Sequence, residues 1–202
     1  MKLYYSPGAC SLAPHIVAAE LGSALTLEKV DIGAQKTAAG LDYRTINTKG
    51  QVPCLQLDDG STLSEGPVIT QYLADQAQAR SMMPAPGTMA RYRVMEWQNF
   101  ITSELHKGFS PLFNPAYDAA AKATMKAGLR RKFEWVDTRL AGRSYLTGED
   151  FTAADAYLFT VTAWAKYVDL NLSDLAHVQA FMARVGSRPA VQRALKEEGL
   201  LG

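Results

Sequence analysis

The sequence has almost no net charge, few cysteines and no long apolar run. Its 202 residues carry 21 lysines and arginines against 20 aspartates and glutamates, a net charge of +1. That balance argues against a general attraction to nucleic acid or anionic lipid. Two cysteines without any CxxC motif argue against a disulfide framework and a Cys/His zinc site. No stretch approaches the roughly 18 apolar residues that a membrane-spanning helix needs, so a soluble globular protein is expected.

The amino-terminal segment has an uncharged run after Lys2, as a secretory signal peptide has. Pro7, Gly8 and Pro14 interrupt this run before an apolar segment can form. We therefore expect no leader peptide and a cytoplasmic location, in which thiols stay reduced. In such a compartment a cysteine in a conspicuous position is a candidate for chemistry rather than for cross-linking.

The first 80 residues alternate between strand and helix patterns. Ser11 suits the N-cap of a first helix that Gly22 ends, and Pro67 suits the first turn of a second helix. Asp59-Gly60 is a hairpin signal. The patterns predict strands over 2–5, 25–30, 52–57 and 62–63, and helices over 11–21 and 67–76.

The composition changes between residues 78 and 88, where Pro84, Pro86 and Gly87 mark a linker. Beyond the linker every pattern is helical, and Thr152 with Asp155 forms a capping-box motif in which Asp replaces the usual Glu or Gln. We therefore predict an α/β domain over residues 1–80 and an all-α domain over residues 88–202. The predicted helices of the second domain cover 89–112, 116–140, 152–166, 175–185 and 189–198.

Cys10 is the first candidate for chemistry. It follows a strand and a Pro-Gly turn and lies just before a helix, where free backbone N–H groups and the helix dipole favour an anion. Such a position lowers the pKa of a thiol and predicts a thiolate at neutral pH. A buried, inert cysteine is equally consistent with the sequence. Cys54, within a predicted interior strand, is interpreted as structural.

Val52-Pro53 is the second candidate, because a proline that enters a strand gives up a ladder hydrogen bond. A cis bond here would turn the Val52 backbone outward, where an extended peptide could pair with it. An ordinary edge-strand proline is the alternative. Glu65-Gly66-Pro67 is the third candidate: a helix N-terminus that could hold a carboxylate on its free N–H groups, or that is simply capped.

A polar stripe runs along the helix that begins at residue 89. Asn99, Ser103 and His106 stand at positions i, i+4 and i+7, so that they share one face of an α-helix. His106 with Lys107 could stabilise a thiolate that lies opposite them. A solvated face and a structural histidine are the alternatives.

Together, the order and spacing of these features resemble the cytosolic glutathione S-transferases, and among them the bacterial beta class. The similarity covers essentially the whole chain. It rests on the run from Tyr4 to Ser11, the run from Gly50 to Pro53, Glu65-Gly66, Asn99, the run from Ser103 to Lys107, and the run from Phe151 to Asp155.

The resemblance implies a thioredoxin-like amino-terminal domain, a helical-bundle carboxy-terminal domain and a homodimer. It also implies glutathione as co-substrate, with no further cofactor and no metal, and a small hydrophobic electrophile as the other substrate. Cys10 and His106 match the catalytic positions, and the cysteine of the beta class can form a mixed disulfide with glutathione. The remaining glutathione contacts that the resemblance implies are Gln35, Val52, Glu65, Gly66, Asn99, Ser103, Glu104, Leu105 and Lys107.

Gln35 departs from the family pattern, because the beta class commonly has lysine at this position, and we expect weaker glutathione binding as a result. The resemblance implies that Thr152 and Asp155 serve folding rather than catalysis. The walls of the electrophile pocket are expected to come from residues 7–9, Phe109, Phe113, Trp164 and Tyr167.

The resulting hypothesis is a transferase that uses glutathione against small hydrophobic electrophiles in xenobiotic detoxification, with dehalogenation or peroxide reduction as related reactions. Two alternatives remain open. One is a glutathione-dependent thiol–disulfide reductase that works through Cys10, for which glutathione itself would have to resolve the mixed disulfide. The other is a non-catalytic ligand-binding or interaction module of the same fold. Neither nucleic acid nor membrane is expected as a partner.

Overall fold

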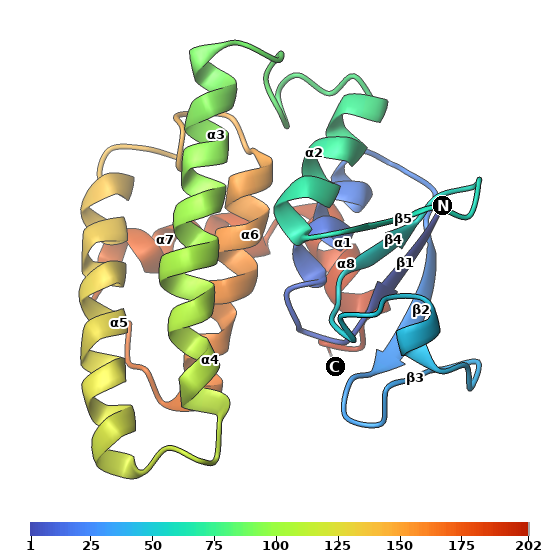
Figure 1. Cartoon of the computed structure of the whole chain (residues 1–202). Helices are drawn as coiled ribbons and strands as arrows, with labels where there is room; N and C mark the ends of the chain where they lie inside the picture. Colours follow the sequence, from blue (N-terminus) through green and yellow to red (C-terminus); the bar gives the residue numbers. More distant parts are fainter. Residues whose placement is uncertain (202) are drawn as a thin grey trace.

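The computed structural model describes residues 1–201 and places a mixed β-sheet beside a larger helical part, with α1, α2 and α8 between them (Figure 1). The sheet has the strand order β3-β2-β1-β4-β5. β1 is parallel to β2 and antiparallel to β4, while β3 and β5 are antiparallel to their neighbours. The strands are β1 (Lys2–Tyr5), β2 (Thr26–Asp31), β3 (Lys36–Thr37), β4 (Cys54–Gln56) and β5 (Thr62–Ser64).

The side chains of β1 alternate between the two faces of the sheet, as the period of a strand requires. Leu3 lies in the main hydrophobic core that the helices share, next in register to Leu27 and Leu55. Tyr4 belongs to a second, smaller cluster, in which its ring lies 5.7 Å from that of Tyr43. Cys54 is buried in the same cluster, in agreement with the structural role predicted for it.

The two helices of the α/β part are α1 (Leu12–Glu20) and α2 (Gly66–Gln76). Gly22 follows the end of α1 with a φ of 63°, as its predicted role requires. Ser11 stands at the N-cap position, but its side chain does not cap the helix. Its hydroxyl instead bonds to the Ser6 N–H at 3.1 Å and the Ser6 carbonyl at 3.2 Å, and so fixes the turn that precedes α1.

The segment between β2 and β4 contains more structure than its polar sequence indicates. The short strand β3 and a 3-10 turn, Tyr43–Thr45, both lie there. A two-residue strand carries too little hydrophobic alternation to be recognised from sequence. β4 begins two residues later than predicted, because the Val52-Pro53 peptide bond is cis and lies outside the ladder. The cis bond was one of two alternatives that the sequence left open, and the strand boundary was not predicted.

The helical part follows the predicted order of elements. Two predicted helices are divided: the first contains a π-helical segment, Ile101–His106, and the third ends in a 3-10 segment, Ala163–Val168. The α-helices are α3 (Met89–Phe100), α4 (Lys107–Phe113), α5 (Ala119–Leu140), α6 (Ala153–Thr162), α7 (Ala176–Gly186) and α8 (Pro189–Glu197).

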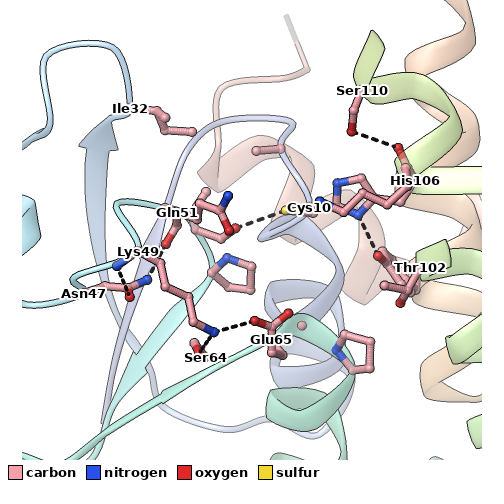
Figure 2. Close-up of a pocket in the computed structure, with 17 residues that line it drawn as sticks. Cys10, Ile32, Asn47, Lys49, Gln51, Ser64, Glu65, Thr102, His106 and Ser110 are labelled. Atoms are coloured by element: carbon pink, nitrogen blue, oxygen red, sulfur yellow. Dashed lines mark hydrogen bonds and ion pairs between the residues drawn. The ribbon is translucent and has the colours of Figure 1, made fainter. Parts of the chain in front are cut away.

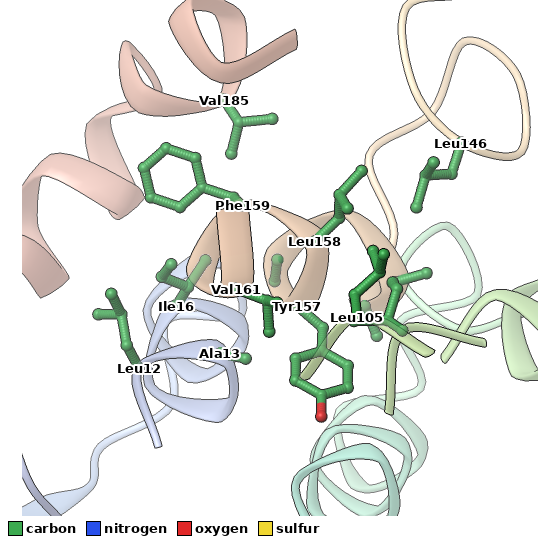
Figure 3. Close-up of a cluster of buried hydrophobic side chains, with 14 of the residues drawn as sticks. Leu12, Ala13, Ile16, Leu105, Leu146, Tyr157, Leu158, Phe159, Val161 and Val185 are labelled. Carbon is green, nitrogen blue, oxygen red and sulfur yellow. The ribbon is translucent and has the colours of Figure 1, made fainter. Parts of the chain in front are cut away.

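α6 is the central helix of the molecule and is buried along its whole length (Figure 3). It packs against α1 on one side and against α3 and α7 on others. Full burial of a side chain such as Val161 or Leu158 contributes about 1.5–3 kcal/mol. The Asp155 carboxylate accepts hydrogen bonds of 2.8 Å from the Thr152 and Leu146 N–H groups. The carboxylate half of the predicted capping box is therefore present, and burial raises the pKa of Asp155 to about 6.

The linker over residues 78–88 is packed rather than loose. Met82 and Met83 are buried, and the Met82 carbonyl accepts the Ala153 N–H at 3.1 Å, at the start of α6. The final helix α8 returns from the helical part to pack on α1 (Figure 1). The two parts therefore share a continuous core. Among the described residues, no helix is both long and apolar enough to cross a membrane.

Candidate active site

A cleft of about 270 Å³ lies where the α/β part meets the helical part (Figure 2). The α/β part contributes the turn before α1, the loop before β4 and the start of α2. The helical part contributes the π-helical segment, α4 and α6. The lining residues are Ala9, Cys10, Ile32, Asn47, Lys49, Gln51, Val52, Pro53, Ser64, Glu65, Gly66, Pro67, Thr102, His106, Lys107, Ser110 and Tyr157.

Cys10 lies at the centre of this cleft (Figure 2), where its thiol donates to the Val52 carbonyl at 3.1 Å. The sequence left a thiolate and a buried, neutral thiol open for Cys10, and the structure favours the neutral thiol. Burial raises the pKa of Cys10 to about 11, and it outweighs the hydrogen bonds from the backbone N–H groups of Cys10 and Ser11 and the charge of Lys107. Desolvation penalises the thiolate more than the helix N-terminus stabilises it. Cys10 is therefore a neutral thiol at pH 7.

The cis Val52-Pro53 bond presents the Val52 backbone to the cleft, as predicted. The Val52 carbonyl faces Cys10, and the Val52 N–H has no hydrogen-bond partner among residues 1–201. The preceding carbonyl, that of Gln51, is held by the Tyr43 hydroxyl at 2.8 Å and the Asn47 amide at 2.6 Å. Because a buried N–H group needs a partner, the free donor of Val52 is suited to an extended peptide ligand.

Glu65 precedes α2 and adopts a φ of 72°, which is uncommon for a residue other than glycine. Its carboxylate lies 2.6 Å from the ammonium of Lys49, which also donates to Ser64 at 3.0 Å (Figure 2). The N–H of Gly66 has no partner within the described chain, and Pro67 has none to offer. The helix start therefore presents both a carboxylate and a free N–H group to a ligand, which favours the binding alternative of the two that the sequence left open.

The polar stripe is divided by the π-helical segment, in which the Lys107 N–H bonds to the Thr102 carbonyl five residues back. The wider turn rotates the following residues relative to a regular α-helix. His106 faces the cleft together with Thr102 and Ser110, whereas Asn99 and Ser103 are exposed outside it. The prediction that Asn99, Ser103 and His106 share one face is therefore wrong for this chain.

Two other residues of the π-helical segment, Glu104 and Leu105, were predicted to contact glutathione but lie outside the cleft. The carboxylate of Glu104 pairs with Lys132 of α5 at 2.7 Å, and Leu105 is completely buried in the core. Lys107 lines the cleft as predicted.

Gln35 also does not line the cleft. Its amide donates to the carbonyls of Ile32 at 2.6 Å and Gly50 at 3.1 Å. The Gln35 side chain thus connects two loops beside the cleft, and it adds no positive charge to the cleft. Lys49 and Lys107 are the two cationic side chains among the residues that line the cleft.

His106 is enclosed by aromatic rings. Its Nδ1 lies 2.7 Å from the Tyr157 hydroxyl, and its ring makes an edge contact with Trp164 at a centroid distance of 4.8 Å. Burial lowers the pKa of His106 to about 4, and the neighbouring charge of Lys107 acts in the same direction. The imidazole is therefore neutral at pH 7. His106 can therefore stabilise a thiolate at this pH by a hydrogen bond rather than by a positive charge.

A second cavity of about 360 Å³ adjoins the cleft and is predominantly apolar. It shares Ala9, Cys10, His106 and Ser110 with the cleft. Its other lining residues are Pro7, Gly8, Phe109, Phe113, Trp164 and Tyr167. Together with the shared Ala9, these are the wall residues that were predicted from sequence. Phe113 and Tyr167 remain half exposed, so the cavity is open to solvent. Cys10 and His106 therefore stand where a polar and an apolar cavity meet.

The turn that carries Cys10 is held from the far end of the chain. The Gly8 N–H donates to the Glu198 carboxylate at 2.8 Å, and the Gly8 carbonyl accepts the Trp164 indole N–H at 2.8 Å. Glu198 also bonds to Nδ1 of buried His15 at 3.0 Å. No role of His15 or Glu198 could be predicted from the sequence, because residues 183 positions apart give no local pattern.

Several other lining residues were missed for comparable reasons. Lys49 and Asn47 stand in a loop that reads only as polar, and Tyr157 lies inside the apolar pattern of α6. For Lys49 a signal was available, since it directly precedes the run from Gly50 to Pro53. For Tyr157 the sequence offers none, because a buried tyrosine is a common core residue.

Family models and known structures agree with this geometry. The model described as "Glutathione S-transferase, N-terminal domain" matches residues 8–76, and that described as "Glutathione S-transferase, C-terminal domain" matches residues 100–189. Glutathione S-transferase GstA of Escherichia coli O157:H7 is 49% identical over 200 residues, which cover 99% of this chain and 100% of GstA. This chain belongs to the glutathione S-transferase family.

Solved structures place the chain more closely within this family. A glutathione S-transferase of a sphingomonad, complexed with glutathione, is 44% identical with a TM-score of 0.95, over 99% of this chain and 100% of that one. The beta-class glutathione S-transferase of Sphingomonas chungbukensis is 41% identical with a TM-score of 0.96, over the full length of both chains. The thioredoxin-like fold and the resemblance to the beta class are thereby confirmed.

Proposed function

We propose that this protein binds glutathione in the cleft and transfers it to small hydrophobic electrophiles held in the adjoining apolar cavity. The observation that carries this proposal is the position of Cys10 and His106 at the boundary between the two cavities. A sulfur atom at that boundary would be within reach of both side chains and of an apolar substrate. The structure of a sphingomonad relative in complex with glutathione supports this assignment.

The polar groups of the cleft suit the backbone and both ends of glutathione. The free Val52 N–H would pair with the central residue of the tripeptide, as an added strand pairs with a sheet edge. The Glu65 carboxylate would bind the ammonium of the γ-glutamyl end, and the Gly66 N–H would donate to its carboxylate. This pairing places the cysteinyl residue of glutathione beside Cys10.

In the transfer step the glutathione sulfur attacks the electrophilic carbon. A C–S bond forms, the leaving group departs with the bonding electrons, and the thiol proton passes to solvent. Cys10 and His106 are both neutral at pH 7. The ring N–H of His106 donates a hydrogen bond to the thiolate of glutathione, and the Cys10 S–H donates a second one when it turns to the thiolate from the Val52 carbonyl. Lys107, which also lines the cleft, adds a positive charge near the developing anion.

The raised pKa of Cys10 favours transfer over the thiol–disulfide reductase that the sequence left open. A reductase needs a thiolate at neutral pH, whereas burial raises the pKa of Cys10 to about 11. Exchange of Cys10 with a glutathione disulfide, which would form the mixed disulfide and release one glutathione thiolate, is then slow at neutral pH. Against a non-catalytic module, the cleft retains the thiol, the imidazole and the free backbone donor together.

We further propose a homodimer that covers the outer face of α3. Met89, Tyr92 and Met95 are exposed on this helix, and Asn99 and Ser103 continue the same face. A second copy on this face would bring Asn99, Ser103 and Glu104 next to another protomer. The resemblance implies that these three residues contact glutathione. In a dimer they could do so across the interface, although they do not line the cleft of their own chain.

The domain boundaries and the location follow from the same function. We propose residues 1–80 as the glutathione-binding unit and residues 88–202, of which 202 lies outside the described residues, as the unit that carries the electrophile-site wall. A cytoplasmic location is proposed because glutathione is kept reduced there, and because both cysteines are free.

The proposal is tested by glutathione conjugation of 1-chloro-2,4-dinitrobenzene and by calorimetric titration with glutathione. His106→Ala should lower kcat/KM about 100-fold, since it removes a hydrogen-bond donor from the reacting sulfur. His177→Ala is the matched control, because His177 is exposed on α7 and away from the cleft. No heat of binding with glutathione, or equal activity of both variants, would refute the proposal.

A further inference from the structure

Tyr157 is a buried polar residue for which neither the sequence pattern nor the proposed reaction assigns a task. It lies in the middle of α6 and is 4% exposed, surrounded by core side chains (Figure 3). Its ring belongs to the hydrophobic core, yet the residue also lines the cleft. A phenylalanine would fill the same core position, so the hydroxyl group requires a separate explanation.

The hydroxyl of Tyr157 meets the imidazole of His106. The oxygen lies 2.7 Å from Nδ1, and the two rings stand at 81° to each other with their centroids 6.0 Å apart. Trp164 fixes another side of the imidazole by an edge contact at 76°. His106 is therefore held in one orientation by two aromatic residues from the helical part.

This contact determines which nitrogen of His106 carries the proton. Burial raises the pKa of Tyr157 and lowers that of His106, so both groups are neutral and a single proton lies between them. The Tyr157 hydroxyl lies 2.7 Å from Nδ1, and the side chain of Thr102 is a second hydrogen-bonding neighbour of the same oxygen. A phenol is a strong donor and an imidazole nitrogen a strong acceptor, so we assign the proton to the phenol oxygen. The ring proton of His106 then resides on Nε2.

Nε2 is the ring nitrogen that remains available to a ligand. His106 lines both the polar cleft and the apolar cavity, and Nε2 has no hydrogen-bond partner within the described chain. We propose that Tyr157 is a positioning residue of the transferase: it accepts no proton itself, but holds His106 with an N–H on Nε2 directed at the glutathione sulfur. The effect on catalysis rests on the proposed function. The tautomer of His106 does not, because it is a property of the free protein.

The first experiment reads the tautomer without glutathione. Nitrogen-15 NMR of the free protein at pH 7 should show the His106 ring as the Nε2–H tautomer, with Nδ1 in the unprotonated range. In Tyr157→Phe the Nδ1 partner is lost, and the spectrum should change to a mixture of the two tautomers. Tyr145→Phe is the matched control, because the Tyr145 hydroxyl bonds Arg188 at 2.9 Å and lines a different cavity.

The second experiment reads the consequence for catalysis. Tyr157→Phe should lower kcat about tenfold at pH 7 while KM for glutathione stays within about twofold. The absorbance of the bound glutathione thiolate should titrate at higher pH than in the wild type. Tyr145→Phe should leave kcat and this titration unchanged.

Each outcome bears on the inference. An Nδ1–H tautomer in the wild-type protein would overturn it, and this reading does not depend on the folding of any variant. Unchanged His106 signals, or unchanged kcat, in a folded Tyr157→Phe would overturn it as well. A wild-type protein that shows the Nε2–H tautomer but no binding of glutathione would contradict the proposed function and leave the tautomer assignment standing.

Discussion

Gly8 and Glu198 are 190 positions apart, and the Gly8 N–H donates to the Glu198 carboxylate at 2.8 Å. This bond joins the turn before Cys10 to the end of α8. The other carboxylate oxygen of Glu198 meets His15 of α1, so one buried side chain connects the catalytic turn, the first helix and the last. The carboxy-terminal segment therefore serves as a support of the active site, although it contributes nothing to the walls of the cleft.

Replacement of Glu198 is expected to cost more stability than replacement of its neighbour. Glu198→Gln removes a fully buried carboxylate from a charged hydrogen bond with His15 and should lower the free energy of unfolding by about 3 kcal/mol. Glu197→Gln is the matched control, because Glu197 also meets His15, at 2.8 Å, but is 45% exposed. It should cost about 1 kcal/mol or less. Urea unfolding at pH 6 measures both, and equal losses would contradict the assigned support role.

The His15 cluster also predicts a pH dependence of stability. Burial alone lowers the pKa of His15, but the hydrogen bonds with Glu198 and Glu197 outweigh burial and the net shift is upward. The folded state thus binds the proton more tightly than the unfolded state. The resulting stability is fully present below about pH 6.5 and is lost as the pH rises through the raised pKa. Glu198→Gln should flatten this decrease in urea unfolding between about pH 6 and about pH 9; an unchanged slope would refute the linkage.

The ionisation of Cys10 is directly measurable by alkylation. With a pKa of about 11, roughly one molecule in 10⁴ carries the thiolate at pH 7. In Cys54→Ala, where Cys10 is the remaining cysteine, the rate of reaction with iodoacetamide should rise about tenfold per pH unit from about pH 7 to about pH 9.5. A plateau of the rate below about pH 9 would mean that the helix N-terminus prevails over burial after all.

The ammonium of glutathione should be recognised by Glu65. Glu65→Gln removes the negative charge and should weaken glutathione binding about tenfold, the value of one charge-assisted hydrogen bond. A glutathione analogue that lacks the α-amino group should bind the wild type and the variant equally. Calorimetric titration of both ligands into both proteins gives four binding free energies, and their difference measures the interaction between Glu65 and the ammonium group. If the variant weakens both ligands alike, Glu65 acts on the helix start and not on the ammonium.

Much of the fold can be predicted from short sequence motifs, each of which extends over only a few residues. The turn before Cys10 and the capping box at Asp155 were predicted, and the cis bond at Pro53 was recognised as an alternative, because each depends on the chemistry of adjacent side chains. The apolar cavity walls were predicted once the resemblance to a known family had assigned an electrophile pocket to the helical part. Boundaries of strands and helices were less accurate.

The rest of the site depends on interactions that no short segment encodes. The π-helical segment moves His106 into the cleft and leaves Asn99 and Ser103 outside, and its sequence differs in no obvious way from an α-helix. The pKa of Cys10 depends on how deeply the folded chain buries the thiol, and not on its place before a helix. Tyr157 meets His106 from a helix 51 residues away in the sequence. Such contacts exist only once the tertiary structure has formed.

The most direct test of the account is a crystal structure of the protein with glutathione bound. The account predicts that the glutathione sulfur lies within about 4 Å of both the Cys10 Sγ and the His106 Nε2, with the cysteinyl backbone paired to the Val52 N–H. A tripeptide bound elsewhere, or bound in the cleft with its sulfur turned away from both side chains, would contradict it.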